Sequence, residues 1–345
     1  MKTDAAGGRV TLAEIAEETG ASLSTISKVL NGRTDVSKPT RERVERVLQE
    51  RGYVRRGAGR SETSAELLEL VFHGLDPIWS MELIGGVEAV AKEHGLSVVL
   101  TVSGDRHAPD PAWIDGVIRR RPVGVVLVFS ELSPEYRERL HARAISYVIV
   151  DPAGDPSPDV PSVGSANWSG GLAATRHLIE LGHRRIAAIT GPEDMMCSLA
   201  RLDGYRSAMN SAGLAIDPAW IHFGTFEVGG GRDHARAVLA LPADRRPTAI
   251  FAGSDLQALG TLDAAREAGL SVPHDLSIVG YDDITLARWV SPPLTTVHQP
   301  LRRMGEEAAR LAIRLSGEPI RGATPRMDLA TNLIVRESTA PPAAA

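Results

Sequence analysis

The sequence predicts a small all-α head joined to an α/β body of two subdomains, each a parallel sheet flanked by helices. Within the first 50 residues, apolar side chains recur at helical spacing in three short stretches. From residue 67 onward, short apolar runs alternate with amphipathic stretches, and this alternation restarts after residue 163. Such alternation is typical of doubly wound α/β domains with right-handed crossovers, so two series predict two similar subdomains.

Signals that start helices divide the head into three. Thr11 can cap the first helix, and Glu14 three positions later completes a capping box. A Gly-Ala break follows, and Ser22 can cap a second helix over 23–30. Ser37 can cap the third. Two short helices joined by a tight glycine-containing turn predict a helix-turn-helix, whose second helix enters the major groove of DNA.

The outward side chains of the second helix are small and polar, with one cation. Lys28 can donate to guanine acceptors, while Leu23 and Ser24 can contact base edges or a thymine methyl group. The side chains better placed for phosphates are Ser22, Thr25 and Ser27. Residues 1–60 carry 12 Lys and Arg against 8 Asp and Glu, and the rest of the chain carries 26 against 35. A basic head on an acidic body is typical of a DNA-binding module.

The composition predicts a cytoplasmic protein with no cofactor, no metal site and no membrane contact. No apolar run approaches the ~18 residues of a membrane span, and no basic-then-apolar signal segment opens the chain. Cys197 is the single cysteine, which excludes internal disulfides and multi-cysteine metal sites.

Two other classes of protein are disfavoured. An enzyme such as a sugar kinase or dehydrogenase would need a catalytic signature. We find no G-x-G-x-x-G after a strand, no Walker loop, no G-x-S-x-G and no H-E-x-x-H. A transport-type binding protein is disfavoured by the missing signal segment and by the attached head.

The predicted strands lie over 67–72, 97–102, 124–129 and 146–150 in the first series and over 184–190, 248–253 and 277–282 in the second. Continuous apolar runs of this kind are typical of parallel strands buried on both faces. The last segments, 295–317 and 327–338, are assigned one to each subdomain, so the chain crosses between them three times. The predicted domains are a head over 8–56, a hinge over 57–65 and a body over 66–340. The body divides into a first subdomain, 66–162 and 294–322, and a second subdomain, 163–293 and 323–340.

Candidate ligand contacts follow the strands, because ligands of open α/β sheets bind beyond the carboxyl ends of the strands. Asp151, Arg201 and Asp282 can bind vicinal hydroxyl groups, and an aromatic side chain can cover the C–H face of a sugar ring. The full set is Asp76, Trp79, Ser130, Asp151, Trp168, Arg201, Phe226, Ser254, Asp255 and Asp282. Structural alternatives stay open for two of them: Asp255 as a helix cap and Trp168 as a core residue.

The stretch VTLAEIAEETGASLSTISKVLNG…VSKPTRERVERVLQERGY, from Val10 to Tyr53, resembles the N-terminal signature of the LacI/GalR (lactose-repressor) transcription regulators. The resemblance implies that Leu23, Ser24 and Lys28 read the operator, and Thr25 and Asn31 also match the motif. Body phrases such as LGHRRIAAITGP, FAGSDLQALG and PLTTVHQP resemble the periplasmic sugar-binding-protein fold of the same family. Its effector site corresponds to Arg201, Ser254, Asp255 and Asp282, although Asn is the common residue at position 254.

The resemblance implies a dimeric repressor that binds palindromic operator DNA and leaves it when a sugar enters the cleft between the subdomains. A regulator of the same fold with a corepressor or a non-sugar effector is the alternative. The runs GLDPIWSMELIGGVE and VVLVFSELS resemble an actinobacterial subgroup, many of whose members respond to plant-polysaccharide sugars such as xylose, xylo-oligosaccharides or cellobiose. A neutral mono- or oligosaccharide is therefore the expected effector.

The segment after the head departs from the family pattern. A hinge helix there carries a leucine that wedges into the minor groove, but Glu62 stands at about that position in this chain. Glycines at 57 and 59 also disfavour a helix. Three alternatives stay open: an extended hinge with Arg55, Arg56 and Arg60 on phosphates or in the groove, a slipped register, or a flexible basic linker.

Overall fold

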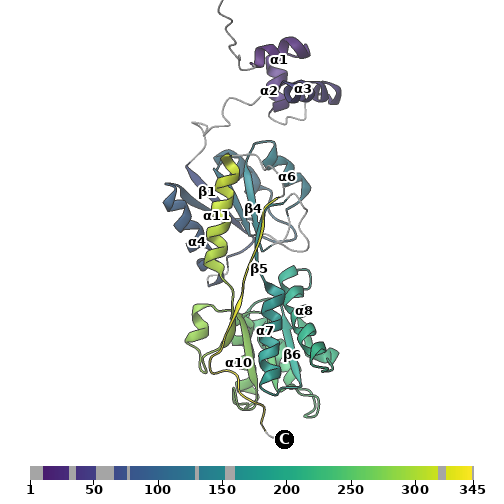
Figure 1. Ribbon diagram of the computed structural model, residues 1–345, viewed down its shortest axis with the longest axis vertical. Coiled ribbons are helices and arrows are strands. Elements are labelled where there is room, and N and C mark those ends of the chain that lie inside the picture. The colour runs from purple at the N-terminus through teal and green to yellow at the C-terminus, as the bar shows by residue number, and fades with distance from the viewer. Residues whose placement is uncertain are drawn as a thin grey trace, which may run out of the picture.

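The computed structural model describes residues 11–30, 36–51, 66–75, 78–128, 132–151, 160–317 and 324–343. A three-helix head precedes a body of two α/β subdomains arranged end to end (Figure 1). The predicted hinge 57–65, with Glu62, lies outside the described residues. No helix in the described part of the chain is long and apolar enough to span a membrane.

The head consists of α1 (Leu12–Thr19), α2 (Leu23–Leu30) and α3 (Lys38–Glu50), as predicted. The capping box is confirmed, because the Thr11 N–H donates to the Glu14 carboxylate at 2.6 Å and the Glu14 N–H donates to Thr11 Oγ1 at 3.4 Å. Ser22 Oγ caps α2 by accepting from the Thr25 N–H at 3.1 Å. One core joins the three helices, with Ile15, Ile26 and Val44 fully buried in it.

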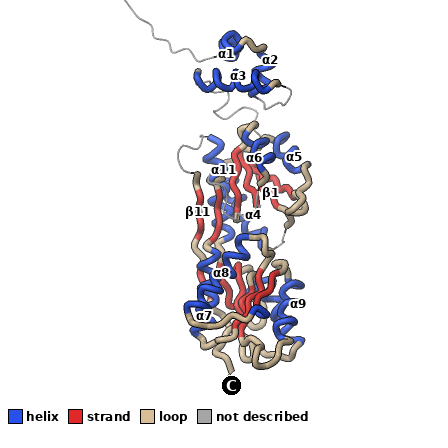
Figure 2. The backbone as a smooth tube through the Cα atoms, turned by 90° about the vertical axis from the view of Figure 1, so that its right-hand side faces the viewer, coloured by secondary structure: helices blue, strands red, loops and turns tan. Residues whose placement is uncertain are grey.

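The first sheet of the body is wholly parallel, in the order β11-β5-β4-β3-β1-β2. Apolar cores lie on both of its faces, and helices flank the strands on either side (Figure 2). Its elements are β1 (Leu67–Phe72), α4 (Trp79–Glu93), β2 (Ser97–Val102), α5 (Ala112–Arg120), β3 (Gly124–Val128), α6 (Pro134–His141), β4 (Ser146–Val150), β5 (Ser162–Ser165), α11 (Leu301–Gly317) and β11 (Arg326–Leu329).

The second sheet has the order β12-β10-β9-β8-β6-β7 and is parallel except for the pairing of β12 with β10. Its elements are α7 (Asn167–Glu180), β6 (Ile186–Thr190), α8 (Met196–Ser211), η1 (Pro218–Trp220), β7 (Ile221–Phe223), α9 (Val228–Leu239), β8 (Ala249–Ala252), α10 (Asp255–Glu267), β9 (Ser277–Asp282), η2 (Thr285–Arg288), β10 (Thr295–His298) and β12 (Asn332–Ile334).

The strand order confirms three crossings between the subdomains but corrects the predicted limits at 163, 294 and 323. β5 and β11 belong to the first sheet and β10 belongs to the second, so each crossing lies closer to the C-terminus than predicted. The crossings fall at 166, at 299–300 and at 330–331. A run of apolar residues predicts a strand, but it does not say which of two neighbouring sheets the strand joins.

The strand predicted at 97–102 is correct in position, but it is not buried on both faces as predicted. β2 occupies 97–102 as predicted, but it is the edge strand of the first sheet. Leu100 is 45% exposed and Val102 is 51% exposed, although Val98 on the same face of the strand packs against the core of the first sheet. This leaves an apolar strip on the surface of the first subdomain.

Glycines allow α7 and α8 to approach closely at the start of the second subdomain. A Cβ atom on Gly171 would lie 2.1 Å from the carbonyl oxygen of Arg201, and one on Gly204 would lie 2.2 Å from that of Trp168. Real Cβ atoms do not come so close to a backbone, so both positions require glycine for packing. The contact places Asn167, at the start of α7, beside Arg201 in α8.

We expect Gly204→Ala to destabilise the protein by about 1–3 kcal/mol, because the added methyl group must push α7 and α8 apart. Urea unfolding measures the change in the free energy of unfolding. Gly229→Ala in α9 is the matched control, since a Cβ atom there would enter open space among the described residues. Equal stabilities of the two variants would contradict the close approach of α7 and α8.

Candidate functional site

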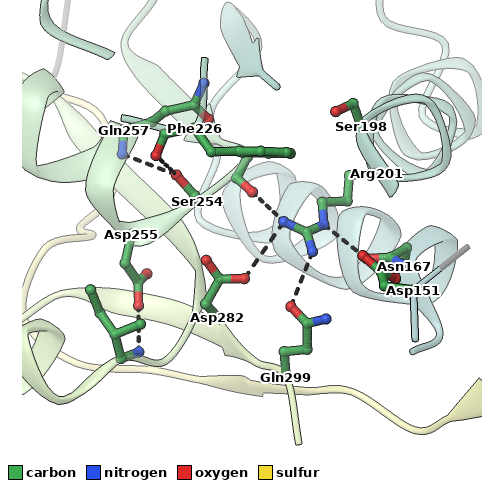
Figure 3. A network of polar contacts seen from close by, with 12 residues as sticks. Asp151, Asn167, Ser198, Arg201, Phe226, Ser254, Asp255, Gln257, Asp282 and Gln299 are labelled. Atoms are coloured by element: carbon green, nitrogen blue, oxygen red, sulfur yellow. Dashed lines mark hydrogen bonds and ion pairs between the residues drawn. The ribbon is translucent and has the colours of Figure 1, made fainter. Parts of the chain in front are cut away.

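Arg201 lies at the centre of a buried polar network where the two subdomains meet (Figure 3). Its side chain is 3% exposed. Nε donates to Asn167 Oδ1 at 2.8 Å, and Nη1 donates to the carbonyl of Gly253 at 2.6 Å. Nη2 donates to Gln299 Oε1 at 3.1 Å. These three acceptors come from α7, from the end of β8 and from the crossing after β10, so one guanidinium joins three distant parts of the chain.

Charge and aromatic contacts complete the surroundings of Arg201. Asp282, the last residue of β9, places a carboxylate oxygen 3.6 Å from Nη1. The guanidinium carbon lies 3.7 Å from the ring centroid of Tyr281 and 5.5 Å from that of Phe226. Burial acts to lower the pKa of Arg201, but Asp282 and the other nearby groups leave that pKa raised. The side chain therefore stays cationic.

The first subdomain reaches this network through Asp151, which follows β4. Asp151 has a positive φ of 52°, and its carboxylate accepts from Asn167 Nδ2 at 3.2 Å. Burial raises the pKa of Asp151, although Arg201 acts in the opposite direction. Because Asn167 also accepts from Arg201, it relays contacts between a carboxylate of one subdomain and a guanidinium of the other. Cys197 lies in the same region, and burial raises the pKa of its thiol to about 12.

The hydrogen bonds of Ser254 and Asp255 are made within the protein. Ser254 Oγ caps α10 by accepting from the Gln257 N–H at 3.1 Å, and it donates to the carbonyl of Phe226 at 3.1 Å. Asp255 is fully buried, and its two oxygens accept from the Ile284 N–H and from the Thr296 hydroxyl. Burial raises the pKa of Asp255 well above its usual range. This corrects the predicted ligand contact at Asp255, because the residue has no exposed surface and both oxygens of its carboxylate accept hydrogen bonds from the protein.

The remaining predicted contacts are scattered. Trp168 is 45% exposed on α7, so the alternative that it belongs to the core is wrong. Trp79 opens α4 and is half-buried against the core of the first sheet. Asp76 and Ser130 lie outside the described residues. The structure brings together Asp151, Arg201, Phe226, Ser254 and Asp282.

Three polar or aromatic residues of the network are absent from the sequence prediction: Asn167, Tyr281 and Gln299. Gln299 follows a parallel strand, which is the rule that selected the other candidates. The prediction treated 295–317 as one segment and did not divide β10 from α11, so Gln299 was not recognised as the residue after a strand. Asn167 and Tyr281 carry no sequence signal of their own, since both stand inside otherwise ordinary helix and strand patterns.

This arrangement suits a ligand with several hydroxyl groups. Carboxylates, amides and a guanidinium supply planar donors and acceptors, and Phe226 supplies an aromatic face beside Arg201. Among the described residues, no group of three or more His, Cys, Asp and Glu side chains is placed to hold a metal ion.

The head presents a second polar surface. Leu23 is 54% exposed, and Ser22, Ser24, Ser27 and Lys28 are exposed beside it. Asn31, Arg55 and Arg56 lie outside the described residues. A groove between α2 and α3 adds three residues that sequence reasoning missed, on the start of α3. Its polar lining is Ser22, Thr25, Lys28, Ser37, Thr40 and Arg43. Hydroxyls and cations of this kind are the usual partners of DNA phosphates.

An ion pair connects the two subdomains on the surface. Arg106, in the loop after β2, donates to the carboxylate of Asp194, in the loop that leads into α8. His107 Nε2 lies 3.4 Å from the other oxygen of Asp194. The hydrogen bond from Arg106 lowers the pKa of Asp194. The pair therefore links the first subdomain to the loop before the helix that carries Arg201.

Comparison with known proteins identifies the family. Residues 11–56 match the model for bacterial regulatory proteins of the lacI family, and residues 175–339 match a periplasmic binding protein-like domain. The chain is 37% identical over 344 residues to the HTH-type transcriptional regulator CelR of Thermobifida fusca, covering 96% of this chain and 98% of CelR. This chain belongs to the lacI family. The resemblance predicted from its head and body is confirmed.

Other members of the lacI family agree with this assignment. The HTH-type transcriptional repressor CytR of Escherichia coli K12 is 34% identical over 343 residues, covering 98% of this chain and 99% of CytR. A solved CelR–cellobiose complex superposes with a TM-score of 0.71 at 35% identity, covering 96% of this chain and 100% of the other. The lac repressor dimer bound to operator and the anti-inducer ONPF superposes with a TM-score of 0.69 at 26% identity, covering 96% and 100%. The relatives named here are transcriptional regulators.

We expect the pair of Arg106 and Asp194 to stabilise the contact between the subdomains by about 0.2–1 kcal/mol, the range for exposed ion pairs. A double-mutant cycle of Arg106→Ala and Asp194→Ala, followed by urea unfolding, measures the coupling. The coupling should shrink in 1 M salt because screening weakens exposed charges. Asp203→Ala is the control, since Asp203 pairs with Arg206 inside α8. A coupling of zero at low salt would show that the two subdomains do not depend on this pair.

Proposed function

We propose that this protein is a dimeric transcriptional repressor that leaves its operator when a sugar binds between its two subdomains. The network of Arg201 is the observation that supports this most. It places planar polar groups beside an aromatic ring at the junction of the subdomains, and it includes residues on two crossing segments. A ligand bound there can change the relation of the subdomains, and the attached head can carry that change to DNA. Operator binding also implies that the protein acts in the cytoplasm.

A neutral sugar fits the electrostatics better than a phosphorylated one. Arg201 already lies 3.6 Å from the carboxylate of Asp282, and Asp151 approaches through Asn167. A phosphate would therefore meet two carboxylates and a cation whose charge is already balanced. Cellobiose is our first candidate, because the CelR structure at 35% identity is a cellobiose complex.

Two features support a dimer: the DNA-binding head and an exposed apolar surface on the first subdomain. Two heads on one palindrome read two half-sites, which requires a two-fold symmetric protein. The exposed apolar residues Leu100 and Val102 on edge strand β2, with Met81 at 59% exposure on α4, offer a surface for the second copy. Analytical ultracentrifugation of the full chain, compared with Leu100→Lys, tests this part of the proposal.

The central experiment is fluorescence anisotropy on palindromic DNA from upstream of the gene for this protein. It is run at fixed salt, because counterion release makes affinity depend on salt. Cellobiose, xylobiose, xylose, glucose, galactose and ribose are titrated in turn. Release by one sugar supports the proposal and names the effector, whereas tighter binding indicates a corepressor. If the protein binds the DNA specifically and no sugar changes that binding, the proposal of a sugar effector is refuted, while the proposal of a transcriptional regulator stands.

We expect Lys28→Ala to weaken binding to the operator by about tenfold or more, because a side chain that reads guanine contributes about 1–3 kcal/mol of discrimination. Binding to random DNA should fall much less. Lys92→Ala on α4 is the control for the loss of one positive charge. Equal losses on operator and random DNA would show that Lys28 contacts only phosphate.

We expect Arg201→Ala to abolish the response to the effector while the affinity for operator without effector stays within about threefold of wild type. Effector binding and operator binding are linked, so a chain that cannot bind the sugar cannot be released by it. Arg201→Lys serves as a second variant, because it keeps the charge but loses the planar fork that reaches Asn167 and Gln299. A full response in either variant would place the effector elsewhere.

A further inference from the structure

Asp282 and Asp283 form a strained backbone turn at the end of β9. Their φ angles are +106° and +57°, in a region that residues other than glycine rarely adopt. The turn sends the two carboxylates to different partners. Asp282 faces Arg201, whereas Asp283 pairs with His298 and Arg336. Strain of this kind persists only where surrounding contacts hold it in place.

Besides the partners of Asp283, the buried carboxylate of Asp255 contacts the turn. Its Oδ2 accepts from the N–H of Ile284, the residue directly after the turn, at 2.8 Å. Its Oδ1 accepts from the hydroxyl of Thr296 in β10 at 2.5 Å. Gly280 stands two residues before the turn and leaves room for this carboxylate, since a Cβ atom there would lie 2.2 Å from Oδ1. One buried carboxylate therefore braces the turn and ties it to the neighbouring strand.

We propose that Asp255 is a positioning residue that fixes the turn at Asp282 and Asp283 and thereby aims Asp282 at Arg201. Asp255 has no exposed surface, so its effect on a ligand passes through the backbone of 282–284. The consequence for ligand binding rests on the proposed function, whereas the bracing of the turn does not. The two parts are therefore measured separately.

Amide hydrogen exchange of the ligand-free full-length protein tests the bracing. Asp255→Asn keeps the size of the side chain but replaces one acceptor oxygen with an amide that donates. We expect exchange at 282–284 to become about tenfold faster, the effect of losing one buried hydrogen bond. Thr296→Val removes only the hydroxyl donor and keeps the bond to Ile284, so it should have a smaller effect in the same direction.

Glu69→Gln is the matched control. Like Asp255, Glu69 is a fully buried carboxylate; it lies in β1 and accepts from Thr101 in β2 and from Arg120 in α5. Its substitution should lower the melting temperature without changing exchange at 282–284. This separates a positioning role from the general cost of disturbing a buried carboxylate.

The second measurement is the dissociation constant for cellobiose and for ribose, with operator affinity recorded in parallel. We expect Asp255→Asn to weaken the binding of the sugar that wild type binds by about tenfold, while operator affinity without sugar stays within twofold. Unchanged exchange at 282–284 in both Asp255→Asn and Thr296→Val would overturn the proposal. So would faster exchange with an unchanged sugar affinity. If wild type binds neither sugar, these sugars fail as effectors, and the exchange experiment still decides whether Asp255 braces the turn. If Asp255→Asn does not fold, Thr296→Val carries both measurements.

Discussion

A guanidinium ion that leaves water needs acceptors for its N–H groups, since an uncompensated buried charge is very costly. Arg201 meets this need with acceptors from α7, from the end of β8 and from the segment after β10. Two of these acceptors, Asn167 and Gln299, stand at crossings between the subdomains. Arg201 therefore holds the first two crossing segments together through its hydrogen bonds.

The third crossing joins the same unit by a separate contact. Thr331 donates its hydroxyl to the carbonyl of Ala166 at 3.3 Å, so the last crossing is tied to the first. A ligand that takes over any acceptor of Arg201 would act directly on this set of segments. Coupling between a ligand site and a distant head then needs no long chain of side chains within the second subdomain. It needs only a change in how the two subdomains are joined.

The sequence predicts the elements of the body better than it predicts the partners of its polar residues. Strands 67–72, 97–102 and 146–150 have the predicted bounds, because the limits of a short apolar run mark where a strand begins and ends. The sequence of β10 does not show which of the two sheets the strand joins. The predicted start of the second part of the first subdomain, at residue 294, was therefore wrong. Asp255 follows β8 and Asp282 ends β9, and only the folded turn shows that one carboxylate is enclosed by the protein and the other faces Arg201. Asn167 and Gln299 are neutral amides, which leave no trace in charge or periodicity.

The single cysteine gives the molecule a built-in chemical reporter. Cys197 is 4% exposed in the region of Asp151 and Arg201, and its high pKa keeps the thiol protonated and slow to react. Asp151 of the first subdomain lies against this thiol of the second subdomain, so separation of the two halves would expose it to an alkylating reagent. We therefore expect the rate of alkylation of the natural chain to rise when the two halves separate, with no engineered label.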